Sequence, residues 1–331
     1  MTNDKLRGRV VSGIQPTGKL HLGNLIGAVE NWVKLQNNYE GYFFIADLHA
    51  LTTAYAETGG LKEDIKQAAL DLLSAGVDPQ RCVLFKQSDV PEHAELHLML
   101  SMITPLPWLE RVPTYKSKIE ELKEKDLGTY GFLGYPVLQA ADILIYKGDL
   151  VPVGEDQLPH LELTREIARR FNFLYGQVFP EPQETMTKFP VLPGIDGRKM
   201  SKSAANAIAI SDAPDVVRKK VNMMITDPAR VKKEDKGHPG VCAIYDYYEI
   251  FAPERAEPVA RQCCEAGRGC VECKKELVEI LLKYLSPLHA RRASFEKEPG
   301  LIERLLGRGA QTARQVASQT LREAKRVMAL I

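Results

Sequence analysis

Residues 8–36 read GRVVSGIQPTGKLHLGNLIGAVENWVKLQ, and this stretch decides the fold class. GRVVSGI, residues 8–14, predicts a buried strand, and NLIGAVENWVKLQ, residues 24–36, has the apolar spacing of an amphipathic helix. Between them, residues 15–24 pack two glycines, a lysine, a histidine and an asparagine into ten positions. A strand, a short turn and a helix in this order predict the first unit of a parallel sheet.

The same alternation continues along the first half of the chain. Further strands are predicted in GYFFIADLHAL (41–51), RCVLFKQSD (81–89) and DLVPVG (149–154), and helices in LKEDIKQAALDLLSAG (61–76), closed by Gly76, and LGYPVLQAADILIY (133–146). From about residue 205 the strand signals fade and amphipathic helix dominates. The sequence therefore predicts an α/β fold, with a boundary to a helical region near the Pro/Gly-rich residues 189–197.

Composition indicates a globular protein. The 331 residues are 44% hydrophobic and 26% charged, enough for a substantial core and two domains. No apolar run approaches the roughly 20 residues of a membrane span, so we expect a cytoplasmic protein without membrane contact. In that reducing compartment, six cysteines point to metal rather than to disulfides. Residues 291–331 hold nine Lys/Arg against four Asp/Glu, compatible with a polyanion partner or with a solvated helix face.

The turn at residues 15–24 is suited to a phosphate. It would lie at the carboxyl edge of the sheet, where ligands of such folds bind. Gly13 and Gly18 let the backbone come close to a ligand, and the helix amino terminus favours an anion. His21 and Asn24 can donate hydrogen bonds to phosphate oxygens. The Walker and G-x-G-x-x-G patterns are both absent, and a glycine-rich turn by itself is more often structural.

A second motif supplies the specificity. GRKMSKS, residues 197–203, places Lys199 and Lys202 three positions apart in a cationic loop suited to a polyphosphate. HLGN near the amino terminus, followed by KMSKS after the α/β region, resembles the paired ATP-binding motifs of class I aminoacyl-tRNA synthetases. On this resemblance, the turn holds ATP.

Four longer strings narrow the resemblance. SGIQPTGKLHLGN (12–24), YPVLQAADILIY (135–146), VPVGEDQLPHLELTREIARRFN (151–172) and KMSKS (199–203) together resemble the tryptophanyl-tRNA synthetases over nearly the whole chain. The resemblance implies a Rossmann-like catalytic domain over residues 1–195, a KMSKS loop at 196–204 and a helical anticodon-binding domain at 205–331, whose last helix could return to the catalytic domain. It also implies ATP with Mg²⁺, L-tryptophan and tRNA(Trp) as substrates, and a homodimer.

Tryptophan offers one indole N–H donor on a large apolar body, so its pocket needs one well-held acceptor. Asp142 fits that role. By resemblance, Tyr135 and Gln157 bind the α-amino group, and Gly13, Gln15, Val151 and Val153 shape the pocket. Two positions depart from the usual pattern: Gln139 replaces a methionine and could touch the indole or hold Asp142, and Val11 replaces an aromatic residue.

The resemblance also assigns the ATP contacts. Lys199 and Lys202 would hold the leaving pyrophosphate, and His21 and Asn24 the α-phosphate and its neighbours. Lys116 and Lys118 are further candidates, although a charged helix face explains them equally well. The full predicted ATP set is Gln15, Thr17, Gly23, Asn24, Gly154, Asp156, Lys199, Met200, Ser201 and Lys202.

The cysteines form a third pattern. Cys263, Cys270 and Cys273 make C-x₆-C-x₂-C, with Cys242 upstream, and Cys264 could replace Cys263 as a ligand. A subset of tryptophanyl-tRNA synthetases carries a [4Fe–4S] cluster on a similar run, which implies a cluster here, with structural zinc or no metal as alternatives. Two other classes of protein are left open: a pantothenate-synthetase-like adenylyltransferase that never meets tRNA, and a non-catalytic iron–sulfur or zinc protein.

Overall fold

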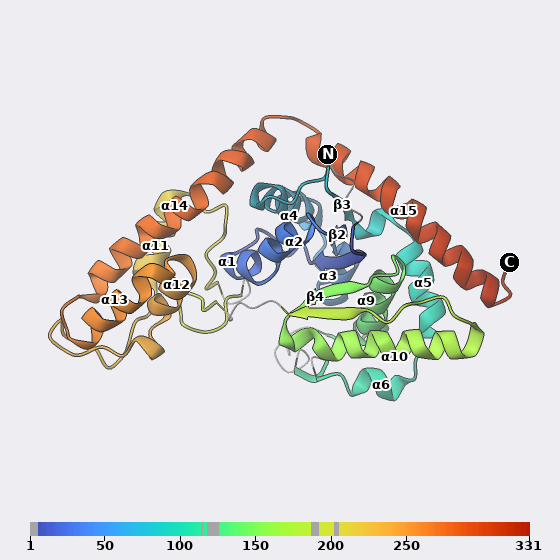
Figure 1. Cartoon of the computed structure of the whole chain (residues 1–331), viewed down its shortest axis with the longest axis horizontal. Coiled ribbons are helices and arrows are strands. Elements are labelled where there is room, and N and C mark those ends of the chain that lie inside the picture. The colour runs from blue at the N-terminus through green and yellow to red at the C-terminus, as the bar shows by residue number, and fades with distance from the viewer. Residues whose placement is uncertain (1–5, 114, 118–125, 187–191, 202–204) are drawn as a thin grey trace.

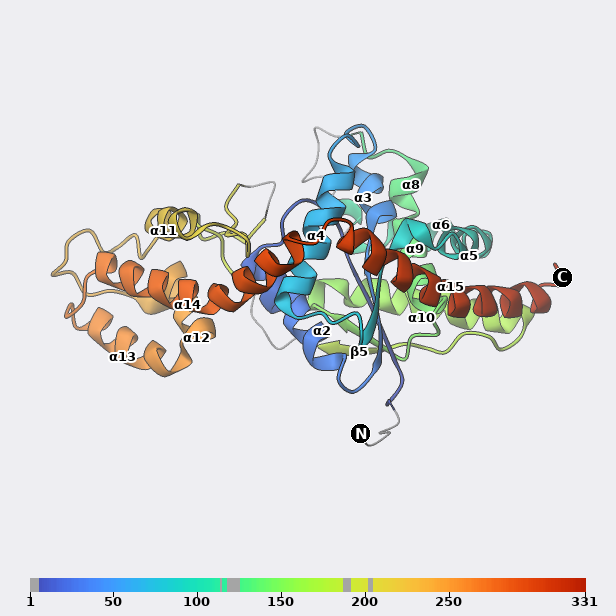
Figure 2. The ribbon, with the colours of Figure 1, turned by 90° about the horizontal axis from the view of Figure 1, so that it is seen from above.

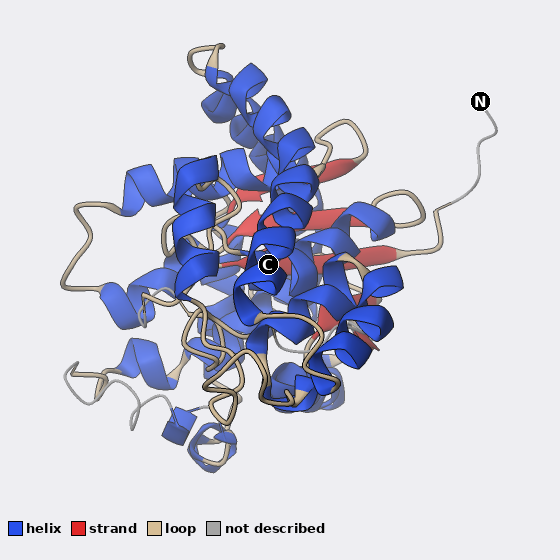
Figure 3. Cartoon of the chain, turned by 90° about the vertical axis from the view of Figure 1, so that its left-hand side faces the viewer, coloured by secondary structure: helices blue, strands red, loops and turns tan. Residues whose placement is uncertain are grey.

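The computed structural model describes residues 6–113, 115–117, 126–186, 192–201 and 205–331. Its centre is a parallel sheet of five strands in the order β3-β2-β1-β4-β5. Figure 3 shows these strands between layers of helices. The predicted α/β fold class is confirmed. The strands are β1 (Arg9–Ile14), β2 (Glu40–Ile45), β3 (Cys82–Lys86), β4 (Leu150–Val153) and β5 (Gln183–Met186).

Alternating side chains on the strands feed two separate cores, as the two-residue period of a strand requires. On one face, Val10, Phe43 and Leu84 pack with the helices that follow β1 and with α4 (Leu61–Ala75). On the other face, Val11 and Phe85 pack with α5 (Glu92–Ser101), α9 (Tyr135–Leu144) and α10 (Leu158–Tyr175). Both faces of the central part of the sheet are therefore buried, which is why β1 to β4 are largely apolar, whereas the edge strand β5 is polar.

The elements around the first strand follow the predicted order. The helix after the turn begins at Leu22 and runs through α1 (Leu22–Asn24), a π-helical segment η1 (Leu25–Val29) and α2 (Glu30–Leu35). Gly76 ends α4 with φ 109°, a left-handed conformation that glycine adopts without strain. The second predicted strand is too long: β2 ends at Ile45, and Asp47–Ala54 forms helix α3. The sequence did not predict β5, because its four residues, QETM, are mostly polar and too few to form an apolar run.

From residue 205 to 331 the chain forms no strand other than the isolated bridge at Ala209. Figure 1 shows α11–α14 gathered on one side of the sheet, and Figure 2 shows α14 and α15 following each other across the molecule. No described helix is long and apolar enough to cross a membrane. The helices are α11 (Pro214–Met223), α12 (Ala243–Phe251), α13 (Pro253–Cys264), α14 (Cys270–Glu296) and α15 (Leu301–Val327), and the shorter ones are α6 (Leu106–Glu110), α8 (Tyr130–Leu133), η2 (Gln87–Asp89), η3 (Glu155–Gln157) and η4 (Pro239–Val241).

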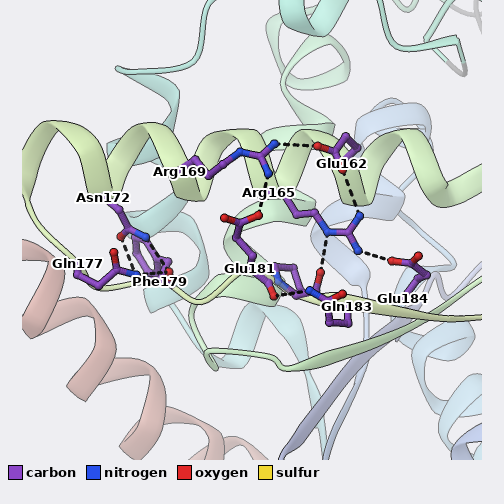
Figure 4. A network of polar contacts seen from close by, with 10 residues as sticks. Glu162, Arg165, Arg169, Asn172, Gln177, Phe179, Glu181, Gln183 and Glu184 are labelled. Carbon is purple, nitrogen blue, oxygen red and sulfur yellow. Dashed lines mark hydrogen bonds and ion pairs between the residues drawn. The ribbon is translucent and has the colours of Figure 1, made fainter.

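A network of charged residues fastens the edge strand β5 to α10 (Figure 4). Arg165 donates to Glu184 on β5 and to the carbonyl oxygen of Pro182 at 2.8 Å. One turn further along α10, Arg169 donates to Glu181 at 2.7 Å. These partly exposed contacts fix the polar edge strand, which has little apolar surface of its own to bury.

We predict that Gly309 is required for α15 to pack against β3. A Cβ atom at Gly309 would lie 1.8 Å from the carbonyl oxygen of Leu84, whereas one at Gly307 would meet nothing within 4 Å. Gly309→Ala should therefore lower the free energy of unfolding by about 1–3 kcal/mol. Gly307→Ala, the matched control, should raise it by about 0.5–1 kcal/mol, because alanine is the better helix former.

Denaturant unfolding of the two variants beside the wild type measures both effects. Equal stability of the two variants would show that the close approach at Leu84 is not needed.

Candidate active site

The predicted turn lies where the sequence places it, directly after β1 at the carboxyl edge of the sheet. Gly13 is the exposed residue of β1, so the strand is open to solvent at its end. A side chain at this position would collide with the Phe44 ring, 2.4 Å from the position of a Cβ atom. Gly18 has φ 94°, which turns the chain toward the helix. The backbone of Thr17 closes the bend by donating to the Gln15 carbonyl at 3.0 Å.

His21 and Asn24 form a reciprocal cap at the start of the helix. The backbone N–H of Asn24 donates to Nδ1 of His21, and the backbone N–H of His21 donates to Oδ1 of Asn24, both at 3.1 Å. Because Nδ1 is an acceptor here, the neutral imidazole carries its proton on Nε2. The side chains proposed as phosphate donors would thus present His21 Nε2 and Asn24 Nδ2.

The two sequence motifs lie side by side. The backbone N–H of Leu22 donates to Ile208 at 3.0 Å, and Ile210 donates back to Leu20 at 2.9 Å. These bonds flank the antiparallel bridge between His21 and Ala209. Met200 packs close to Gly23, 3.7 Å from where a Cβ atom would be. Residues 20–24 and the segment around Met200 therefore form one surface, although about 180 positions separate them.

Asn206 holds the described part of the KMSKS loop, a role the sequence analysis missed. Its Oδ1 accepts from the backbone N–H of Ser201 at 2.7 Å, and its Nδ2 donates to the carbonyl of Lys199 at 3.2 Å and to Asp196 at 2.7 Å. Asn206 is buried, while the Lys199 side chain is exposed. Lys202 and Lys118 lie outside the described residues. Because asparagine has both an acceptor and a donor end, it can bind two backbone groups of the loop at once.

Asp142 is buried at the same edge of the sheet and accepts three hydrogen bonds. His49 Nε2 lies 2.8 Å from one carboxylate oxygen, and Gln87 Nε2 and His93 Nδ1 lie 2.7 and 2.6 Å from the other. The far nitrogen of His93 lies 2.7 Å from the Tyr146 hydroxyl. The sequence analysis did not identify these partners. Their one signal was position, since His49 and Gln87 follow the ends of β2 and β3.

These donors keep Asp142 ionised. Burial by itself raises the pKa of the carboxyl, but the hydrogen bonds from His49 and His93 outweigh it and lower the pKa to about 2. A carboxylate offers about four acceptor positions, and three are used by side chains here. Protein donors therefore occupy three of about four acceptor positions on this buried, charged group.

Four other residues predicted to bind tryptophan lie on α9 and β4. Tyr135 shares α9 with Asp142, and its hydroxyl lies 3.3 Å from His160 Nε2. Val151 and Val153 are buried from β4 against Ile143 and Leu161. Gln139 is partly exposed and is not among the three side chains that donate to Asp142, so the predicted role of holding that carboxylate belongs to the other three.

Three more predicted residues follow the end of β4. Gln157 Nε2 donates to Asp156 at 3.1 Å, and Asp156 is exposed. Gly154 is tight against the same carboxylate, because a Cβ atom there would lie 2.9 Å from Asp156 Oδ1. The three residues therefore form one short polar segment at the carboxyl edge, beside the strand that carries Val151 and Val153.

The four predicted cysteine ligands converge in the helical region. Cys242, Cys263, Cys270 and Cys273 line one cavity between η4, α12, α13 and α14. Arg230 donates to Cys263 Sγ at 3.4 Å and Arg268 to Cys273 Sγ at 3.2 Å. Cys264 is exposed and does not line this cavity.

The thiols are not placed for a single metal ion. Among the described residues, no group of three His, Cys, Asp or Glu side chains could hold one. Burial raises the pKa of the Cys263 and Cys273 thiols, while the neighbouring arginines act in the opposite direction. The structure thus confirms that the four cysteines meet, but gives the zinc alternative no preformed site. It also gives no support for placing the chain in the iron–sulfur subset.

Comparison with known proteins shows the family of this chain. The family model "tRNA synthetases class I (W and Y)" matches residues 3–286. The tryptophan–tRNA ligase of Thermotoga maritima is 48% identical, covering 98% of this chain and 99% of the relative, and that of Aquifex aeolicus is 44% identical over 97% and 100%. The crystal structure of tryptophanyl-tRNA synthetase from Campylobacter jejuni, complexed with ADP and tryptophan, superposes with TM-score 0.86 at 33% identity, covering 97% of this chain and 99% of that one.

The chain therefore belongs to the class I tRNA synthetases of the tryptophan and tyrosine type, and within them to the tryptophan–tRNA ligases. This is an enzyme family, so the alternative of a non-catalytic metal protein is wrong. A small-molecule adenylyltransferase that never meets tRNA is excluded for the same reason.

We predict that Asn206→Ala frees the KMSKS loop and weakens ATP use. The loop backbone at Lys199 and Ser201 would lose its buried partner, and the loss of such a bond costs about 1–3 kcal/mol. The KM for ATP in pyrophosphate exchange should rise about tenfold or more, with tryptophan affinity unchanged. Asn37→Ala, an exposed asparagine at the end of α2, is the control and should behave as the wild type. An unchanged KM for ATP in Asn206→Ala would contradict the role of Asn206.

Proposed function

We propose that residues 15–24 and 199–202 hold ATP, and that Asp142 accepts the indole N–H, while this chain activates L-tryptophan and transfers it to tRNA(Trp). The contact of Met200 with Gly23 carries the first assignment, because it brings the two motifs together, and the bridge between His21 and Ala209 holds the segment that follows the second motif beside the first. The buried, ionised Asp142 at the same edge supports the second.

The first step needs positioning and charge stabilisation rather than an enzyme nucleophile. The tryptophan carboxylate attacks the α-phosphorus of ATP in line, the bond to the bridging oxygen breaks, and pyrophosphate leaves. His21 Nε2–H and Asn24 Nδ2 would donate to oxygens of the α-phosphate. The ammonium groups of Lys199 and Lys202 would neutralise the charge that builds on pyrophosphate.

Mg²⁺ arriving on the phosphates of ATP would neutralise further charge, as it does when substrate phosphates supply most of its ligands. In this arrangement the phosphates supply most of the ligands of Mg²⁺. In the second step, a ribose hydroxyl of the terminal adenosine of tRNA takes the acyl group and releases AMP.

Amino-acid choice follows from the environment of Asp142. The indole N–H would fill the remaining acceptor position of the carboxylate, while Val151 and Val153 give the pocket apolar surface. Phenylalanine brings no donor and would leave a buried charge incompletely paired. A site built to bind a donor rejects an analogue without it by about 10⁴-fold.

Removing the charge of Asp142 tests both substrate and site. We expect Asp142→Asn to lose most tryptophan-dependent pyrophosphate exchange and most of its preference for tryptophan over phenylalanine. The measurement is exchange with each amino acid in turn, for wild type and variant. Asp227→Asn is a matched control, because Asp227 is also buried and accepts from a histidine, His238 at 2.8 Å, but lies in the helical region after α11. It should keep the preference for tryptophan.

Two outcomes would contradict the proposal. Wild-type exchange that did not depend on tryptophan would reject the substrate, and wild-type discrimination retained in Asp142→Asn would reject the residue.

The helical region and the last helix supply surfaces for the larger partners. We propose that residues 205–331 receive tRNA(Trp), supported by exposed arginines along α15. They are Arg304, Arg308, Arg314, Arg322 and Arg326. A homodimer is supported by the apolar residues Leu98 on α5, Met102 directly after α5 and Leu106 on α6, which are 54%, 70% and 59% exposed. Exposed apolar side chains gathered in one place are typical of a protein interface.

We also propose a [4Fe–4S] cluster in the cavity lined by Cys242, Cys263, Cys270 and Cys273. Four thiols facing one cavity supply the donor set of such a cluster, which spreads its ligands more widely than a single ion does. Arg230 and Arg268 donate to two of the sulfur atoms and would balance the negative charge of the thiolates. Because this cavity lies among the helices of the region proposed to receive tRNA, the cluster would serve structure or tRNA positioning.

The cluster prediction is tested with protein purified without oxygen. The wild type should be brown, should absorb broadly at about 400 nm, and should contain iron and sulfide. Cys273→Ser should lose the colour while keeping most tryptophan-dependent exchange. Cys82→Ser, a buried cysteine on β3, is the control and should keep the colour. Colourless wild-type protein without iron or sulfide would reject the cluster.

A further inference from the structure

A buried carboxylate supports the ATP turn from outside the two motifs. Asp71 on α4 is fully buried, and its Oδ2 accepts from the backbone N–H of Leu20 at 2.7 Å. The other oxygen, Oδ1, forms an ion pair with Arg292 Nη1 on α14. A contact chain therefore runs from α14 through Asp71 to the residue that precedes His21.

The same helix reaches the other side of the turn. His289, one turn before Arg292 on α14, lies with Nε2 2.9 Å from the carbonyl oxygen of Ile210. Ile210 in turn donates its backbone N–H to Leu20 at 2.9 Å. Helix α14 thus contacts both segments of the pairing between residues 20–22 and residues 208–210, which follow the second ATP motif.

The charge of Asp71 makes this support depend on Arg292. The Leu20 amide is fully buried, and an ionised acceptor gives a shorter and stronger bond than a neutral one. A buried carboxylate stays favourable only when its charge is paired. The paired charge comes from a residue 221 positions later in the chain. Arg292 supplies a positive charge directly against this carboxylate, so we expect its removal to weaken the bond from Leu20 to Asp71.

We propose that Asp71 and Arg292 are positioning residues for ATP. They fix the backbone at Leu20, and through it the orientation of the His21 cap, so that the turn is preformed for the nucleotide. The proposal rests on the assignment of residues 15–24 to ATP. We do not expect the proposed tryptophan pocket to change, because the hydrogen bonds to Asp142 come from α3, η2 and α5 and involve neither Asp71 nor Arg292.

The test measures KM for ATP and for tryptophan separately in pyrophosphate exchange. Asp71→Asn should raise the KM for ATP by about tenfold, the size expected for losing a charged hydrogen bond, and leave the KM for tryptophan within about twofold. Arg292→Gln should act in the same direction. In the double variant, Arg292→Gln should add less than about twofold to the effect of Asp71→Asn, because both residues act through one contact.

Two controls separate positioning from general damage. Arg291→Gln removes a neighbouring contact between the same two helices, the bond from Arg291 to the Ser74 carbonyl at 2.6 Å, and should leave both KM values unchanged. Arg292→Lys keeps the charge and provides a milder variant if Arg292→Gln does not fold, as judged by thermal melting. It should recover most of the affinity for ATP.

Each result decides a separate point. Equal losses for ATP and tryptophan, or additive effects in the double variant, would overturn the positioning role. Wild-type enzyme without tryptophan-dependent exchange would instead reject the proposed function.

Discussion

The parallel pairing of β1 with β2 on one side and β4 on the other is the constraint on which the site depends. Parallel strands end at the same edge, so the residues that follow each strand are brought together whatever their separation in sequence. The turn after β1, His49 after β2, Gln87 after β3 and Gly154 after β4 all meet this condition. The side chains of the central strands are buried in the cores on both faces of the sheet, so the polar residues of the proposed site come from the segments that follow the strands.

Three buried carboxylates show a second constraint, the pairing of charge in the interior. Asp142 accepts from His49, Gln87 and His93, Asp71 is paired with Arg292, and Asp227 accepts from His238. For Asp142 and Asp71 the partners come from other elements of the chain, so these two ions are stable only in the assembled fold. Two of the three lie beside a predicted substrate, and a buried charge there gives both a strong acceptor and a fixed position.

The sequence was sufficient wherever the signal is local. Alternating apolar runs located β1 to β4, and Gly76 ended α4 as predicted. The short strings HLGN and KMSKS located His21, Asn24 and Lys199, because phosphate binding needs certain residue types within a few positions of one another. Local signals failed in two places: β5 is too polar to read as a strand, and the apolar run of β2 gave no sign that helix α3 starts at Asp47.

What only the tertiary structure decided is which distant side chains meet. His93 is 49 positions from Asp142, and Arg292 is 221 positions from Asp71, so no spacing rule connects them. Asn206 looked like an ordinary loop residue until its contacts to Lys199 and Ser201 were seen. The sequence by itself determined β1 to β4, the helix after β1, α4, α9 and the two predicted phosphate motifs, because these depend on neighbours along the chain. The partners of the buried charges depend on strand register and helix packing, which exist only once the chain has folded.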